Sequence, residues 1–167
     1  SQYRGSDGSE GFDEFGGADL ADVLNLYPIA QQLPFADENR LGMLGYSRGG
    51  MMTFLAIKAG LPVRAAAVVG APTDLVALYW ARKDLREDLT ALVGGTPASA
   101  PAAYEARSAS LWPEQLTCPL LILHGERDWR VEISQSRLLM EKLQHTDLPH
   151  RFIRFPRSDH SLSAVSY

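Results

Sequence analysis

Four short apolar runs constrain the fold of this chain more than any other feature, because each has the length of one buried strand. They cover residues 41–45, 64–69, 120–123 and 151–155. Segments with apolar residues at helical spacing lie beside or between them and cover residues 18–33, 48–59, 75–92 and 132–144. Pro28 predicts a kink or an early stop in the first of these helices. Strands that alternate with helices predict a mainly parallel sheet of about four strands, flanked by helices and connected by right-handed crossovers.

The length of 167 residues fits one α/β domain. Three alanines and two valines in the run at 64–69 predict a strand that is buried on both faces. Residues 74–111 follow this strand and combine a helical pattern with a break at GGTP, residues 94–97. Insertions of this length in small α/β domains usually form a lid or a binding element. We therefore expect a lid-like helical insertion at 74–111.

Charge and composition exclude several classes of partner. Acidic residues outnumber basic residues by 20 to 16, so the net charge is −4 and the chain lacks the basic excess that binding to nucleic acid requires. Its apolar stretches are far shorter than the roughly 20 residues that span a membrane. Cys118 is the single cysteine and no Cys/His cluster has metal-ligand spacing, so we expect no disulfide, no metal and no other cofactor. The first residues do not resemble a signal peptide, which leaves localisation almost unconstrained, with the cytoplasm slightly favoured.

The sequence GYSRG at residues 45–49 matches the motif G-x-S-x-G and lies between a predicted strand and a predicted helix. A serine on such a turn has a strained backbone that points its hydroxyl out of the sheet. Small residues must surround it so that strand and helix can approach, and Gly45, Gly49 and Gly50 meet that need. Ser47 is therefore a candidate nucleophile. The alternative interpretation is a glycine-rich turn in which Ser47 only caps the helix.

A serine hydroxyl is a good nucleophile only when a base takes its proton and a third group orients that base. Asp128 follows the third predicted strand and His160 follows the fourth, at the sheet edge where ligands bind. The order Ser, Asp, His is that of the α/β-hydrolases. Asp74 is a second, lower-ranked candidate for the acid, and we interpret Asp159 as a turn former and His124 as a structural histidine. A turn role for Asp128 and a structural role for His160 are the alternatives.

The chain resembles the catalytic domain of the prolyl oligopeptidase family of serine peptidases, within the α/β-hydrolase superfamily. The stretches that carry the resemblance include YRGS at 3–6, GGAD at 16–19, GYSRGG at 45–50, GGTP at 94–97 and CPLLILHGERD at 118–128. The resemblance implies that Ser47 is the nucleophile, Asp128 the acid and His160 the base. It also implies hydrolysis of peptide or ester bonds through an acyl-enzyme, with the backbone N–H of Arg48 as one oxyanion donor.

Members of this family carry further strands, and usually a β-propeller or another N-terminal region, before the segment that here starts at Tyr3. Their second oxyanion donor comes from a loop in that upstream part, and a helix normally follows the catalytic histidine, whereas this chain stops at Tyr167. We therefore expect residues 1–167 to form a partial α/β-hydrolase fold, a fragment truncated at both ends. Its uncovered sheet edge is expected to allow self-association.

These observations predict a serine hydrolase that cleaves peptide bonds. Two alternatives stay open, an esterase of the dienelactone-hydrolase type and a non-catalytic remnant of the fold. The expected partners are a peptide or small ester substrate and a second copy of the chain, with no nucleic acid and no membrane.

Overall fold

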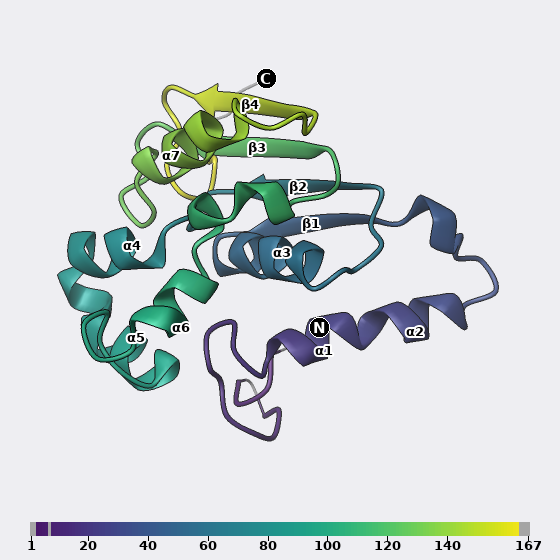
Figure 1. Cartoon of the computed structure of the whole chain (residues 1–167), viewed down its shortest axis with the longest axis horizontal. Helices are drawn as coiled ribbons and strands as arrows, with labels where there is room; N and C mark the ends of the chain where they lie inside the picture. Colours follow the sequence, from purple (N-terminus) through teal and green to yellow (C-terminus); the bar gives the residue numbers. More distant parts are fainter. Residues whose placement is uncertain (1–2, 7, 164–167) are drawn as a thin grey trace.

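In the computed structural model, which describes residues 3–6 and 8–163, four parallel strands form one sheet in the order β1-β2-β3-β4 (Figure 1). The strands are β1 (Gly42–Tyr46), β2 (Ala65–Val69), β3 (Leu120–Gly125) and β4 (His150–Phe155). The predicted parallel α/β sheet is confirmed. Both ends of each predicted strand lie within two residues of the ends of the observed strand.

Two helices connect neighbouring strands. The helix α3 (Arg48–Lys58) links β1 to β2, and α7 (Ser134–Leu143) links β3 to β4. Most of α3 is buried, with Met51, Met52 and Phe54 fully inaccessible to solvent, so this helix supplies much of the core. None of the described helices is long and apolar enough to cross a membrane.

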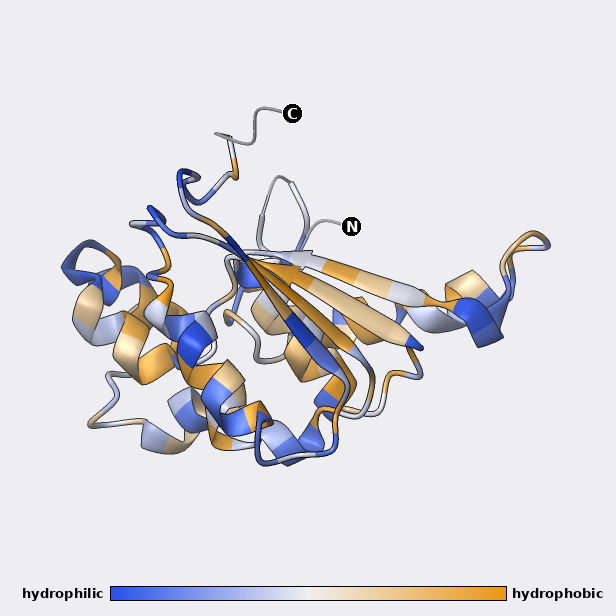
Figure 2. Ribbon diagram, turned by 90° about the horizontal axis from the view of Figure 1, so that it is seen from above, coloured by the Kyte–Doolittle hydropathy of each residue, from blue (hydrophilic) through white to orange (hydrophobic). Residues whose placement is uncertain are grey.

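The helices of the described residues lie on one side of the sheet (Figure 2). On the strand β2 the side chains of Ala66 and Val68 are buried, whereas Ala67 and Val69 on the opposite face are only half-buried. The prediction that this strand is buried on both faces is therefore wrong. Its physical reason is that no described helix covers the second face, where Leu44 of β1 is 72% exposed.

Residues 74–111 form a group of helices after β2, as the helical pattern predicts. They are α4 (Leu75–Ala81), α5 (Arg86–Val93) and α6 (Pro101–Ala106), with single 3₁₀ turns at η2 (Lys83–Leu85) and η3 (Ala109–Leu111). A further 3₁₀ turn, η4 (Pro113–Gln115), leads toward β3. Leu75, Leu89 and Tyr104 are buried in the common core, so the group packs as part of the domain.

The predicted helix at 18–33 is divided into α1 (Leu20–Leu24) and α2 (Leu26–Gln31), followed by the 3₁₀ turn η1 (Glu38–Arg40). The break falls at Asn25, and Pro28 lies inside the first turn of α2. Backbone N–H groups in a first turn have no partner within the helix, so the missing N–H of proline costs least there. Pro28 thus explains why α2 begins anew just before it.

Candidate active site

Ser47 occupies the turn between β1 and α3 in a backbone conformation that side chains rarely adopt, with φ 53° and ψ −123°. Its amide donates to the carbonyl of Val69 at 2.7 Å, which ties the turn to the neighbouring strand. Such a conformation costs on the order of 1–3 kcal/mol and persists only where the surrounding structure imposes it. The turn therefore presents Ser47 at the carboxyl edge of the sheet.

At two of the three glycines around Ser47, the neighbouring atoms leave no room for a side chain. A methyl group at Gly45 would overlap the carbonyl of Gly49, and one at Gly50 would overlap the side chain of Ala71. At Gly49 the nearest atom to such a methyl group is the Tyr3 hydroxyl at 3.7 Å, an ordinary contact. The close approach of β1 and α3 thus depends on positions 45 and 50.

Asp128 and His160 come from the loops after β3 and β4, and the structure brings them together. Both are buried, each with 5% of its surface exposed. His160 Nδ1 lies 2.6 Å from Asp128 Oδ2. Because an ionised carboxylate only accepts hydrogen bonds, Nδ1 carries the proton and Nε2 is left as the free acceptor of the ring.

The carboxylate of Asp128 is surrounded by donors. Oδ1 accepts from the amides of Arg130 and Val131, each at 2.9 Å, and Oδ2 faces His124 Nε2 at 3.2 Å in addition to His160. Burial acts to raise the pKa of this carboxyl, but the contacts with His124, the Val131 amide and His160 outweigh it and hold the pKa below its usual range. Asp128 is therefore held ionised at neutral pH.

Ser47 and His160 line one cavity of about 180 Å³. Among the described residues, the imidazole of His160 hydrogen-bonds to Asp128 and not to Ser47. The ring of Tyr46 packs beside the imidazole of His160, with 5.0 Å between the ring centroids. Apolar residues and three arginines complete the lining: Phe15, Pro72, Leu78, Leu85, Val131, Arg48, Arg82 and Arg130.

The side chain of Arg48 anchors the N-terminal loop beside Ser47. Its guanidinium forms a bidentate pair with Asp13, and its Nη2 lies 2.6 Å from Oδ2 of the fully buried Asp19. The rings of Tyr3 and Phe15 lie against it, with centroids 4.4 and 4.8 Å from Cζ. Sequence reasoning did not identify this cluster, because nothing in the local pattern connects residue 48 to residues 13 and 19.

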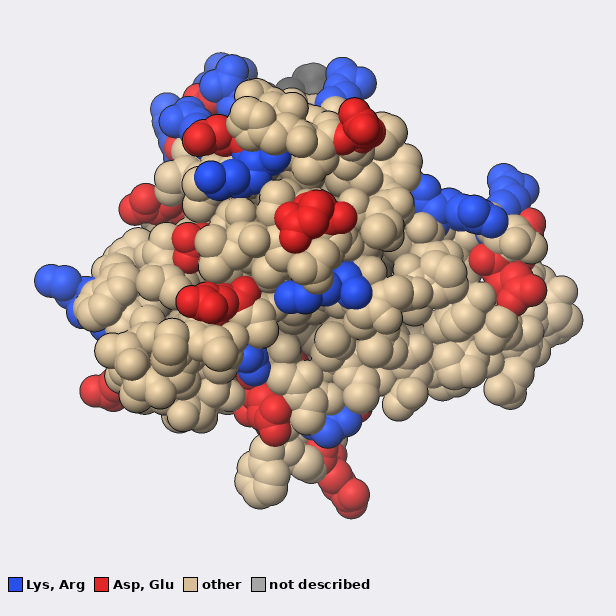
Figure 3. Space-filling view, viewed as in Figure 1, with Lys and Arg blue, Asp and Glu red and all other residues tan. Residues whose placement is uncertain are grey.

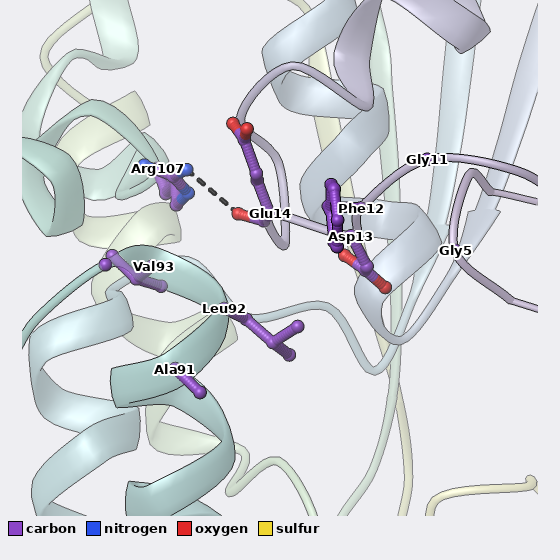
Figure 4. Close-up of a pocket in the computed structure, with 10 residues that line it drawn as sticks. Gly5, Gly11, Phe12, Asp13, Glu14, Ala91, Leu92, Val93 and Arg107 are labelled. Atoms are coloured by element: carbon purple, nitrogen blue, oxygen red, sulfur yellow. Dashed lines mark hydrogen bonds between the residues drawn. The ribbon is translucent and has the colours of Figure 1, made fainter.

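Arg107 anchors the same loop from a larger hollow of about 540 Å³ between the loop and α5 (Figure 4). Its Nη2 donates to the carbonyl of Glu14 at 2.9 Å, and its Nε donates to the carbonyl of Phe15 at 3.0 Å. The two arginines thus fix the backbone that brings Phe15 to the cavity beside Ser47.

The other candidates from the sequence have different surroundings. Asp74 caps the helix α4 by accepting from the Ala77 amide, and Asp159 accepts from Ser161 and Ser163 within its own turn. His124 is fully buried and reaches Asp128, a contact that its position at a strand end did not reveal. Among the residues described, no group of three His, Cys, Asp or Glu side chains is arranged to hold a metal ion.

Comparison with known proteins identifies relatives along almost the whole chain. A family model described as the prolyl oligopeptidase family matches residues 2–167. The uncharacterized peptidase YtmA of Bacillus subtilis is 36% identical over 148 residues, which cover 88% of this chain and 58% of that protein. The uncharacterized peptidase YuxL of the same organism is 29% identical over 92% of this chain and 24% of its own length.

Among solved structures, a puromycin-hydrolyzing peptidase of Mycobacterium tuberculosis superimposes with a TM-score of 0.81 at 28% identity. The match covers 88% of this chain and 22% of that one. The chain thus spans little more than half the length of one curated relative and about a quarter of another.

Proposed function

We propose that this chain, which belongs to the prolyl oligopeptidase family, carries the reaction site of a serine peptidase that works through an acyl-enzyme. Ser47 is the nucleophile, His160 the general base and Asp128 the acid that orients it. The observation that carries the proposal is the 2.6 Å hydrogen bond between buried Asp128 and His160. It lies at the carboxyl edge of the sheet, where the strained turn presents Ser47.

The first step forms a bond between Ser47 Oγ and the carbonyl carbon of the substrate, while the hydroxyl proton passes to His160 Nε2. The carbonyl electron pair moves to oxygen, and the resulting oxyanion needs a donor. Arg48 is the first residue of α3, so its amide has no partner within the helix and lies where the helix dipole favours negative charge. We assign the backbone N–H of Arg48 as one oxyanion donor.

In the second step the tetrahedral intermediate collapses, the bond to the leaving amine breaks and His160 returns its proton to that amine. Water then attacks the acyl group on Ser47 with His160 again acting as base, which releases the carboxylic acid and the free serine. Asp128 stays ionised throughout and stabilises the imidazolium that forms twice in this cycle. The three hydrogen bonds that its carboxylate accepts and the nearby His124 ring support this role.

The lining of the cavity supports a substrate with an apolar side chain next to the scissile bond. Five of its lining residues are apolar, and Leu78 and Leu85 come from the segment 74–111, which supports the lid-like role expected for that segment. Peptides and esters share the acyl-enzyme route. The ratio of kcat/KM for an aminoacyl anilide and for a short acyl ester therefore ranks peptidase against esterase activity.

The decisive experiment is covalent labelling with a fluorophosphonate, which reacts only with an activated serine. We expect labelling of the natural protein, its loss in Ser47→Ala and its retention in Ser161→Ala, an exposed serine beside His160 that serves as the control. Hydrolysis in Ser47→Ala should fall by on the order of 10⁴-fold or more. A folded protein that takes up no label would favour the non-catalytic alternative.

A further inference from the structure

His124 is a fully buried histidine on β3 that the mechanism above does not use. Its Nδ1 lies 2.7 Å from the hydroxyl of Ser136 on α7, and its Nε2 lies 2.8 Å from the carbonyl of Val131. A carbonyl oxygen can only accept, so Nε2 carries a proton. The surroundings of the ring therefore fix both its orientation and the position of this proton.

The same Nε2 lies 3.2 Å from Asp128 Oδ2, the oxygen that accepts from His160 at 2.6 Å. Two imidazole nitrogens thus face a single carboxylate oxygen: His160 Nδ1 in a hydrogen bond, and His124 Nε2 in a longer contact beside its hydrogen bond to the Val131 carbonyl. The other oxygen of Asp128 already accepts from two backbone amides, those of Arg130 and Val131. Both oxygens of the carboxylate thus have nitrogen neighbours, and His124 is the Oδ2 neighbour to which the proposed mechanism gives no part in proton transfer.

We propose that His124 is a positioning residue for the reaction: its Nε2–H holds Oδ2 of Asp128 in place and shares the charge that this oxygen offers to His160. This inference rests on the proposed function of Asp128 and His160. Without the His124 N–H, His160 would be the only imidazole N–H close to Oδ2 among the described residues. The oxygen would then attract the imidazolium more strongly, and His160 would retain its proton to higher pH.

Other charged and titratable groups surround His160, and a substitution at position 124 leaves all of them unchanged. The Tyr46 ring packs against it, Asp159 precedes it in the chain, and Arg48, Arg82 and Arg130 line the same cavity. None of these groups bonds to His124 among the described contacts, so its substitution changes only the contacts of the ring with Ser136, the Val131 carbonyl and Asp128 Oδ2.

The experiment uses a matched pair of amides at position 124 in the protein at its natural length. In His124→Gln the amide nitrogen can reach the place of Nε2, whereas the shorter chain of His124→Asn reaches only the place of Nδ1, toward Ser136. The pH at which His160 titrates is read from its imidazole resonances by NMR, assigned with His160→Asn, and from the acid limb of kcat/KM.

We expect the titration in His124→Asn to move up by about 0.5–1 pH unit, and kcat to fall about tenfold with little change in KM. In His124→Gln the titration should remain close to that of the natural protein. Ser136→Ala removes the hydroxyl on the other side of the ring and leaves the Nε2 proton, so its titration should not move. A merely structural role would lower the amount of folded protein without this pattern.

The proposal is overturned if the titration of His160 in folded His124→Asn stays in place or moves to lower pH. If this variant does not fold, His124→Leu, which also lacks a donor, gives the same comparison. NMR titration needs no turnover, so failure of the proposal for His124 can be distinguished from failure of the proposed peptidase function. Absence of fluorophosphonate labelling in the natural protein contradicts the proposed function, whereas an unmoved titration contradicts only the role of His124.

Discussion

Gly125, the last residue of β3, determines how closely the loop that carries His160 can approach the sheet. A methyl group at this position would overlap the backbone carbonyls of Ser158 and Asp159. The amide of Arg127 donates to the Ser158 carbonyl at 3.0 Å, so the two loops lie directly against one another here. The 2.6 Å bond between Asp128 and His160 therefore depends on the missing side chain of a glycine three residues upstream of Asp128.

We predict that Gly125→Ala displaces residues 158–160 and lowers kcat by about 10–100-fold, since misplacement of a catalytic group by about 1 Å can cost 10²-fold. Steady-state kinetics measure the effect, with circular dichroism to verify the fold. Gly42→Ala is the matched control, because a methyl group there meets only the Ala65 carbonyl at 3.6 Å. Equal kcat values for the two variants would contradict this account of Gly125.

At the scale of elements, the start of α3 and the N-terminal loop are joined by a buried ion pair. The carboxylate of Asp19 is fully buried and accepts from Arg48 and from the Gly16 amide. Removal of one partner of a buried pair leaves the other charge unpaired in a medium of low polarity. This junction should therefore contribute more to stability than the more exposed pair between Arg4 of the loop and Asp22 of α1.

We predict that Arg48→Met lowers the free energy of unfolding by about 3 kcal/mol, because the buried Asp19 then loses the cation that is hydrogen-bonded to it. The double variant with Asp19→Asn should recover part of this loss, since a neutral amide is less costly to bury. Urea denaturation provides the measurement. Arg4→Met, which breaks the more exposed pair with Asp22, is the control and should cost clearly less. Equal losses in the two single variants would contradict the prediction.

Elements with a strong local pattern could be predicted from the sequence, and those that depend on tertiary packing could not. The strand at 120–123 is an apolar run bounded by Pro119 and Gly125, so it was located within two residues. The helix at 18–33 has one continuous apolar stripe, yet it divides at Asn25 because Pro28 cannot donate a hydrogen bond.

The same distinction applies to the site. Ser47, Asp128 and His160 could be selected because a motif and strand ends point to them, and their roles stay a proposal. The contact of His124 with Asp128 and the pairing of Arg48 with Asp19 arise only when separate elements pack together. A buried histidine at a strand end has the same sequence pattern whether or not its ring reaches a carboxylate. Only the three-dimensional arrangement separates the two cases.

At the scale of the whole molecule, the two edges of the sheet differ in charge. The edge strand β4 carries exposed Arg151 and Arg154, which oppose the addition of a further strand. The opposite edge strand β1 has no charged residue, and its Leu44 is 72% exposed and its Tyr46 47% exposed. Elsewhere, on the face shown in Figure 3, acidic and basic side chains are interspersed. Self-association therefore remains a prediction, and β1 is the edge that favours it.

We predict that the isolated chain shows concentration-dependent association in sedimentation velocity, and that Leu44→Lys weakens it. Lysines on exposed edge strands oppose the addition of a further strand, and position 44 would lie beside the strand that a second copy adds to β1. Leu111→Lys is the matched control, since Leu111 is also exposed, at 54%, but lies in η3 outside the sheet. Association that is unchanged in Leu44→Lys, or equally weakened by both substitutions, would show that contacts other than the β1 edge hold the copies together.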